Sequence, residues 1–234
     1  VSAPNPTFIG RKLNDLFFHR NRLGFIADEN VVMSRAGEFY EFFPETVVTV
    51  LDTDPLDVAS THSKVSILRH VVSFAEELLL FSDQTQFMMT GGTTLTAKNV
   101  AINVATEFEM DKDVKPIGSG NNVFFAFPKG NFTGFREFFV EDTTDVKKAD
   151  DITANVPKYI PKNIFKMSVA TNENIVVALS SDEQNALYIH QFFSSNQKKL
   201  QSAWHKWIFG ASATETILGM DFIENLLYLV IERS

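Results

Sequence analysis

Residues 76–89 read Glu76-Glu77-Leu78-Leu79-Leu80-Phe81-Ser82-Asp83-Gln84-Thr85-Gln86-Phe87-Met88-Met89. A short apolar run, Leu78 to Phe81, is followed by the polar turn residues Ser82-Asp83-Gln84 and then by a second β-prone run. Both runs are too short for an ordinary helix, and turn residues join them. This stretch therefore predicts two antiparallel strands.

The same pattern occurs at five places along the chain. Apolar runs that follow a polar turn begin at Leu23, Leu78, Val123, Ile175 and Leu226. Successive runs start 45 to 55 residues apart, from 123 − 78 to 78 − 23. A repeat of about 50 residues is too long for the common helical repeats and is typical of a four-stranded propeller blade.

We therefore predict an all-β fold of propeller-like repeats, in one region that spans residues 1–234. The blade-like repeats are expected near 21–43, 71–110, 114–140, 164–209 and 217–234. Further strands are expected at Val71–Ala75, Val114–Ile117, Ile164–Ala170 and Ile217–Ile223, with outer strands at Glu38–Phe43 and Ala203–Phe209. Helical periodicity is weak and is best in Phe8–His19. A β-sandwich and two small β domains are the alternative folds.

The composition excludes several classes of protein. The chain has no cysteine, which excludes disulfides and thiolate zinc sites. Its formal net charge of −8 disfavours tight, sequence-independent binding of nucleic acid. No apolar run approaches the roughly 20 residues that span a bilayer. The absence of an initiator Met and the apolar run just before the C-terminus favour a fragment of a longer chain.

Acidic and histidine residues were weighed as metal ligands. Asp52, Asp54 and Asp57 lie within six residues, but they lack the glycine and distal glutamate of a calcium loop, so turn chemistry is the preferred interpretation. The histidines are scattered and show no metal-binding spacing: His19, His62, His70, His190 and His205. His190 alternates with Tyr188, which predicts a packing role on one strand face.

Candidate nucleophiles and phosphate loops are equally weak. Ser119 lies between Gly118 and Gly120, but Asn121-Asn122 follows where a nucleophile elbow needs a helix, which favours a turn. Gly91-Gly92 is flanked by threonines and has no following Gly-Lys-Ser/Thr, so a loop is expected.

A glycosidase needs two carboxylates that face one another across a sugar. Glu107 and Glu109 would share one face of a strand, a pairing that is common by chance. A sugar-stacking surface was considered for four aromatic residues, Phe132, Phe135, Trp204 and Trp207, although core positions are the commoner role. We predict no catalytic, cofactor-binding or metal-binding residue, no cofactor and no enzyme.

Several stretches resemble the tail tubular protein B (nozzle protein) family of T7-like podophages. They are Phe17–Phe25, Val31–Arg35, Phe39–Pro44, Leu80–Phe87, Arg136–Phe139, Val156–Pro161 and Leu226–Arg233. The resemblance covers nearly the whole chain, and it consists of a general likeness without a catalytic signature.

The resemblance implies a structural component of a short non-contractile phage tail that forms the nozzle channel for genome ejection into the host. It implies self-association in a ring, expected to be a hexamer in the full-length protein, and contact with tail tubular protein A and with tail fibres. DNA would pass through the channel without specific binding. The protein would reside in the virion tail after assembly in the host cytoplasm.

Two other functions stay open at this point. Trp204, Trp207 and the many acidic residues motivate a polysaccharide-binding or depolymerising tail protein. A peptide-binding propeller is the third interpretation, although the chain lacks the Trp-Asp ends of one common propeller family.

Overall fold

The structure is a computed structural model that describes residues 3–62, 66–141, 144–195, 198–210 and 215–233. Within these ranges the chain is all-β, with eighteen strands and one short 3-10 helix, η1 (Thr171–Glu173). The chain divides into two compact units, residues 1–112 and 113–234, and each is described by itself.

The first unit consists of two four-stranded antiparallel sheets, each ordered as the strands follow in the chain. The first sheet contains β1 (Leu13–His19), β2 (Arg22–Ala27), β3 (Asn30–Met33) and β4 (Leu56–Ala59). The second sheet contains β5 (Leu68–Phe74), β6 (Glu77–Ser82), β7 (Gln86–Thr90) and β8 (Ala101–Thr106). Up-and-down sheets of this kind are the unit of propeller-like folds.

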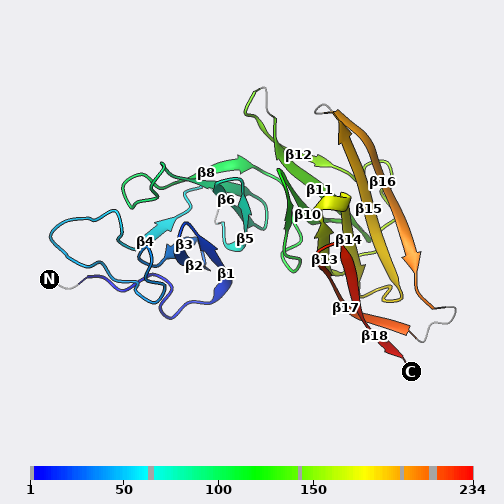
Figure 1. The fold of residues 1–234 in the computed structure, drawn as a ribbon, viewed down its shortest axis with the longest axis horizontal. Coiled ribbons are helices and arrows are strands. Elements are labelled where there is room, and N and C mark those ends of the chain that lie inside the picture. The colour runs from blue at the N-terminus through cyan, green and yellow to red at the C-terminus, as the bar shows by residue number, and fades with distance from the viewer. Residues whose placement is uncertain (1–2, 63–65, 142–143, 196–197, 211–214, 234) are drawn as a thin grey trace. The chain divides into compact units, whose positions relative to one another are not determined.

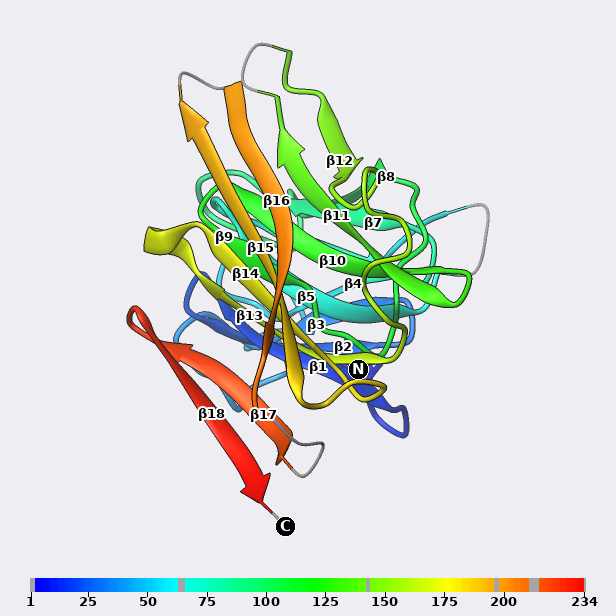
Figure 2. The ribbon, with the colours of Figure 1, turned by 90° about the vertical axis from the view of Figure 1, so that its right-hand side faces the viewer.

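The second unit repeats the arrangement (Figures 1 and 2). The third sheet contains β9 (Ile117–Ser119), β10 (Asn122–Lys129), β11 (Phe132–Val140) and β12 (Lys147–Asp151). The fourth contains β13 (Ile164–Ala170), β14 (Ile175–Ser180), β15 (Ala186–Ser195) and β16 (Lys198–Ile208). A two-stranded ribbon follows, formed by β17 (Glu215–Ile223) and β18 (Leu226–Arg233).

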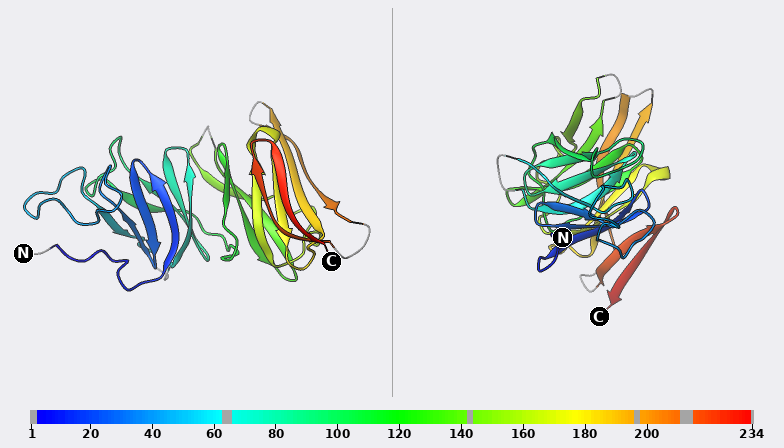
Figure 3. Two further views of the ribbon diagram at one scale, coloured as in Figure 1. Left: turned by 60° about the horizontal axis from the view of Figure 1, so that its bottom comes forward. Right: turned by 90° about the vertical axis from the view of Figure 1, so that its left-hand side faces the viewer.

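The core of the first unit lies between its two sheets. Ile26 and Met33 of the first sheet pack in one cluster with Leu78, Leu80 and Phe87 of the second, and Figure 3 shows the two sheets lying face to face. The run Leu78 to Phe81 is fully buried, although successive residues of a strand point to opposite faces. Leu78 and Leu80 belong to the cluster between the two sheets, and the burial of their neighbours as well accounts for the continuously apolar sequence of β6.

The second unit is built on the same principle. Phe124 and Phe135 of the third sheet share a cluster with Met167 and Tyr188 of the fourth. The opposite face of the fourth sheet, including Val177, packs on the β17–β18 ribbon through Ile217 and Met220. The fourth sheet is thus covered on both faces.

The predicted hairpins are confirmed. The pairing of Leu78 with Met89 and of Leu80 with Phe87 follows the pattern of residues 76–89. The apolar runs that begin at Leu23, Val123 and Ile175 likewise form β2, β10 and β14 beside their predicted partners. The strand predicted at Ile164–Ala170 is β13 with the same bounds.

The stretch with the best, though weak, helical periodicity, Phe8–His19, ends in strand β1, in which Leu16 to Phe18 pair with Phe25 to Leu23. Two other local predictions are wrong. Glu38–Phe43 is not a strand; this segment turns back through an Arg35–Glu38 bridge, and the outer strand of the first sheet is β4. The strand predicted at Val114–Ile117 lies later, at Ile117–Ser119.

The all-β class and the four-stranded sheets are as expected, whereas a single propeller-like region over residues 1–234 stays a prediction. Among the described residues, no helix is both long and apolar enough to cross a membrane.

Candidate functional site

One end of the first unit gathers four chain connections. The β1–β2 turn, the β5–β6 turn, and the long β3–β4 and β7–β8 connections all leave their antiparallel sheets at this end. Arg20 and Asn21, the two turn residues between β1 and β2, have φ values of 45° and 60°. Positive φ at both positions is the geometry of a tight two-residue hairpin turn, which fixes the adjacent side chains of β1 and β2.

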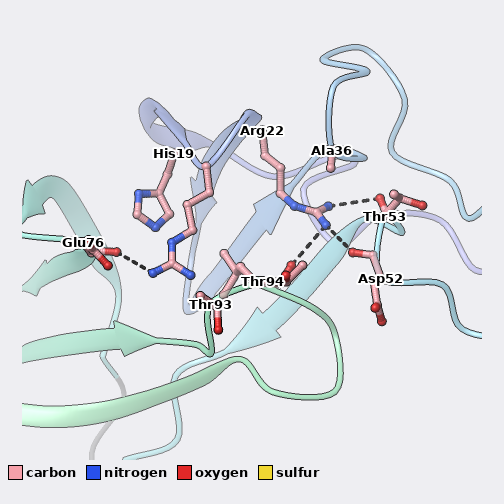
Figure 4. Close-up of a pocket in the computed structure, with 10 residues that line it drawn as sticks. His19, Arg22, Ala36, Asp52, Thr53, Glu76, Thr93 and Thr94 are labelled. Carbon is pink, nitrogen blue, oxygen red and sulfur yellow. Dashed lines mark hydrogen bonds between the residues drawn. The ribbon is translucent and has the colours of Figure 1, made fainter.

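These connections surround a pocket of about 470 Å³, shown in Figure 4. Its lining residues are His19, Arg20, Arg22, Ala36, Asp52, Thr53, Glu76, Thr93, Thr94 and Leu95. The walls therefore come from both sheets of the unit, and most of the lining side chains are polar.

Arg22 lies at the back of this pocket and is 1% exposed. Its guanidinium donates to the carbonyl oxygens of Ser34 (2.7 Å), Asp52 (2.9 Å) and Asp54 (2.6 Å), and at 3.3 Å to those of Thr53 and Leu95. Burial lowers the pKa of Arg22, and the nearby Asp54 charge acts in the opposite direction. A single buried cation therefore holds the β3–β4 and β7–β8 connections in place.

Arg20 holds the second side of the pocket. Its guanidinium donates to the carbonyl oxygens of Gly92 at 2.5 Å and of Glu76 at 3.1 Å. Neither Arg20 nor Arg22 forms an ion pair within the described part of the chain. Their two positive charges are thus met by carbonyl dipoles, with no carboxylate at bonding distance.

The Gly91-Gly92 segment is packed closely in the β7–β8 connection. A Cβ on Gly91 would lie 2.3 Å from Leu95 Cδ1, and a Cβ on Gly92 would lie 3.0 Å from Asn99 Nδ2. Asn99 also donates to the Thr94 carbonyl at 2.7 Å and accepts from the Thr96 amide at 2.8 Å. The segment is a loop, as predicted, and its glycines allow it to approach its own side chains.

The three aspartates considered as a calcium site are separated in the structure. Asp54 accepts from the Leu51 amide at 2.8 Å, as a turn residue does. Asp57 accepts from the Thr7 amide and hydroxyl at 2.8 and 2.7 Å, while Asp52 lines the pocket. Within the described residues, no cluster of three or more His, Cys, Asp or Glu side chains has the arrangement of a metal site.

The five histidines do not form a common site within the described residues. His19 lines the pocket, and burial together with the Arg20 charge lowers its pKa. His62 faces Glu107 at 3.1 Å, and His70 faces the Lys112 carbonyl at 2.8 Å. His205 lies beside Trp207 on the outer strand β16.

His190 is fully buried in the second unit, between the third and fourth sheets. Its ring lies 5.0 Å from Trp204, 5.5 Å from Phe192 and 6.0 Å from Phe124. Its Nε2 is 3.0 Å from the Ser202 hydroxyl, and its Nδ1 has no hydrogen-bond partner. Burial lowers the pKa of His190 to about 4, so the ring is neutral at pH 7.

A buried carboxylate lies in the same unit. Glu137 is 2% exposed and is paired with the Lys199 ammonium, and Asn122 Nδ2 donates to its Oε1 at 2.7 Å. Burial lowers the pKa of Lys199. This pair links β11 to β16 and has a structural explanation without a ligand.

The remaining candidates do not form a common site. Ser119 ends β9, is buried and lies 3.4 Å from the Thr171 hydroxyl. Glu107 and Glu109 follow the end of β8, so the prediction that they share a strand face is wrong.

The four aromatic residues are also divided. Phe135 and Trp204 pack together in the core at 5.0 Å, and the Trp204 indole donates to the Ile152 carbonyl at 3.0 Å. Trp207 is 43% exposed, and Phe132 is half-buried beside the β10–β11 turn. The described residues thus contain no joint stacking surface formed by this set.

Sequence reasoning missed the pocket arginines. Arg20 and Arg22 resemble ordinary polar residues of a turn, and the usable signal is the position of Arg22 directly before the apolar run Leu23 to Ile26. An arginine in that position must find acceptors as the strand becomes buried.

Comparison with known proteins places the chain among phage tail proteins. The family model described as bacteriophage nozzle protein matches residues 1–234. Tail tubular protein gp12 of Escherichia phage T7 is 37% identical over 232 residues, which is 99% of this chain and 29% of the T7 protein. The chain therefore spans less than a third of the length of this relative.

Solved structures resemble the fold. Hsv2 of Kluyveromyces lactis gives a TM-score of 0.55 at 12% identity, over 92% of this chain and 57% of that chain. The N-terminal domain of Nup159 gives a TM-score of 0.52 at 9% identity, over 98% of this chain and 56% of that chain. A putative 6-phosphogluconolactonase from Bacteroides uniformis gives a TM-score of 0.52 at 11% identity, over 98% of this chain and 62% of that chain. Likeness at such low identity concerns the fold alone.

Proposed function

Because this chain belongs to the bacteriophage nozzle protein family, we propose that it forms part of the nozzle channel through which a short non-contractile tail ejects the genome into the host. The observation that carries this proposal is the match of the whole chain to the family, with 37% identity to the T7 tail tubular protein. The family supports a structural component of a phage tail, and the channel is our proposal for its role there.

The architecture suits a structural role. The strands at the centre of the packed sheets are almost entirely buried, as in β6 and β14, where five of six residues are buried. Packing of this density resists deformation, as the wall of a channel must during passage of DNA. Each unit has its own core between two sheets, and in the second unit the fourth sheet is packed on both faces.

The charge of the chain suits passage of DNA without capture. The formal net charge is −8, with 29 acidic against 21 basic residues. Binding of duplex DNA depends on basic side chains that displace counterions from its phosphates, and this composition lacks an excess of them. An acidic wall repels the duplex and lets it move.

The partners belong to the proposal as well. We propose self-association in a ring, a hexamer in the full-length protein, with tail tubular protein A above it and tail fibres attached nearby. Assembly takes place in the host cytoplasm, and the finished protein resides in the virion tail. We assign no catalytic role to the chain, because the carboxylates and the serine considered for catalysis do not form a common site.

The test is negative-stain imaging of the full-length protein, alone and mixed with tail tubular protein A at micromolar concentration. Rings or a tapered tube with a central channel are the expected result. Particles that stay monomeric in both samples would overturn the ring proposal.

A further inference from the structure

The pocket of the first unit carries chemistry for which a channel wall has no need. We propose that it binds a carboxylate-bearing sugar unit, such as a uronate, with the carboxylate on Arg20 and the sugar hydroxyls on Thr93, Thr94, Asp52 and Glu76. This is a binding site for an acidic carbohydrate, and it does not rest on the proposed nozzle role.

Two arginine side chains of the pocket have no carboxylate at bonding distance within the described residues. Arg20 has five N–H donors, of which two are used, both on carbonyl oxygens. Arg22 lies behind it as a second guanidinium with carbonyl partners only. The planar donor fork of arginine matches a carboxylate, and it does so better where protein walls exclude part of the solvent.

The pocket also contains polar side chains that make no hydrogen bond within the described residues. Among the described residues, the hydroxyls of Thr93 and Thr94 and the carboxylates of Asp52 and Glu76 have no hydrogen-bond partner. All four residues line the pocket; in Figure 4 Asp52 lies beside Arg22, and Glu76 lies on the opposite side of the pocket. The carboxylates only accept hydrogen bonds, so a matching ligand must offer several donors.

These two features together select the ligand. Asp52 and Glu76 would repel a compact polyanion such as a triphosphate several times more strongly than a single carboxylate, and a neutral sugar would offer the free N–H donors of Arg20 no charged acceptor. One negative charge beside several hydroxyl groups satisfies both, and this is the chemistry of a sugar acid. The volume of about 470 Å³ lies within the range of small-molecule sites, about 300–1,000 Å³.

Hydrogen bonds hold the pocket walls in place, most clearly in the β7–β8 connection. Arg20 and Arg22 hold the carbonyl groups of Gly92 and Leu95, while Asn99 fixes the same connection from its other side. The pocket walls are therefore held before a ligand arrives, which lowers the entropic cost of binding. A wall formed only by mobile loop residues would lack these bonds.

The test is a titration of the protein, monitored by NMR and calorimetry, with methyl glucuronoside and with methyl glucoside, which has a neutral hydroxymethyl group in place of the carboxylate. The glucuronoside is expected to bind and the glucoside to bind at least about tenfold more weakly, as expected for loss of a charge-assisted pair. Equal binding of both sugars would overturn the assignment of Arg20. Equal binding of inorganic phosphate would overturn the assignment of the hydroxyl partners.

Variants separate the site from the fold. Arg20→Ala and the near-isosteric Thr94→Val are expected to weaken glucuronoside binding, the first by about tenfold or more. Arg11→Ala is the matched control, because Arg11 is half exposed, pairs with Asp28 and is not among the residues that line the pocket. If Arg20→Ala unfolds the unit, Thr94→Val carries the test; unchanged binding in a folded Thr94→Val protein contradicts the proposed site.

Free sugar acids and acidic units within a polysaccharide share this chemistry. Polygalacturonate and its methyl-esterified form distinguish the two sources, since esterification removes the charge and keeps the chain. Binding of the monosaccharide alone assigns a free ligand, and binding of the charged polymer assigns a surface polysaccharide. No binding of either charged ligand would overturn the proposal and leave the ring experiment unaffected.

Discussion

Arg22 is the residue on which the loop end of the first unit depends most. It is buried, and its guanidinium donates hydrogen bonds to backbone carbonyl groups of the β3–β4 and β7–β8 connections, including those of Ser34 and Leu95. These two residues lie outside the strands. A surface arginine in a single ion pair has no comparable role, because water replaces its partner when the pair is broken.

We predict that Arg22→Met destabilises the protein by about 3 kcal/mol or more, because several buried carbonyl oxygens lose their donor. The measurement is chemical denaturation, with Arg11→Met as the control, for which we expect a loss of at most about 1 kcal/mol. Equal stability of the two variants would show that the carbonyl groups find other donors.

His190 predicts a dependence of stability on pH. The pKa of His190 is about 4 in the folded protein, against 6.5 for an ordinary histidine, so the unfolded chain binds more protons between these values. The stabilisation from the neutral ring is complete above pH 6.5 and is lost as the pH falls toward 4, by up to about 3 kcal/mol.

The measurement is the denaturation midpoint from pH 7 to pH 4.5 for the parent and for His190→Phe, which fits the surrounding aromatic rings. The variant is expected to lose less stability over this interval, whereas His205→Gln on the outer strand behaves as the parent does. Parallel curves for the parent and His190→Phe would contradict the prediction.

At the scale of single elements, both units contain a hairpin in which a glycine lies directly opposite a phenylalanine. Gly24 of β2 lies opposite Phe17 of β1, and Gly134 of β11 lies opposite Phe127 of β10. A Cβ on either glycine would come within 2.2 or 2.3 Å of the opposing ring. The phenylalanine ring thus covers the bare backbone of the glycine across the hairpin.

We predict that Gly24→Ala destabilises the first unit by about 1–3 kcal/mol, because the ring of Phe17 must move from its packed position. Gly219→Ala is the matched control, since that glycine lies in strand β17 with no atom within 4 Å of an added Cβ. Calorimetry and amide hydrogen exchange of β1 and β2 measure the effect. A Gly24→Ala protein as stable as Gly219→Ala would disprove the packing argument.

At the scale of the whole molecule, charge is the property that matters for the proposed channel. The excess of acidic residues makes the chain a poor ligand for duplex DNA at physiological salt. We predict no retardation of linear duplex DNA by micromolar protein in a gel-shift assay at 150 mM salt. Binding that weakens steeply with added salt would instead indicate a basic patch that the net charge hides.

The sequence by itself determined the all-β class, the hairpins and the repeat of about 50 residues. Continuous apolar runs such as Leu78 to Phe81 determine their own strands, because they must be covered on both faces and are too short for a helix. The polar strand β12, Lys147–Asp151, has no such signal and forms because β11 offers it a hydrogen-bonding edge.

Only the tertiary structure determined the pocket. His19, Asp52, Glu76 and Thr94 are far apart in the sequence, and they come together because two antiparallel sheets bring four connections to one end of the first unit. Burial of Arg22 and His190 depends likewise on layers that pack from distant parts of the chain. Local patterns specify hydrogen-bonded neighbours, whereas the environment of a polar side chain depends on which sheet covers it.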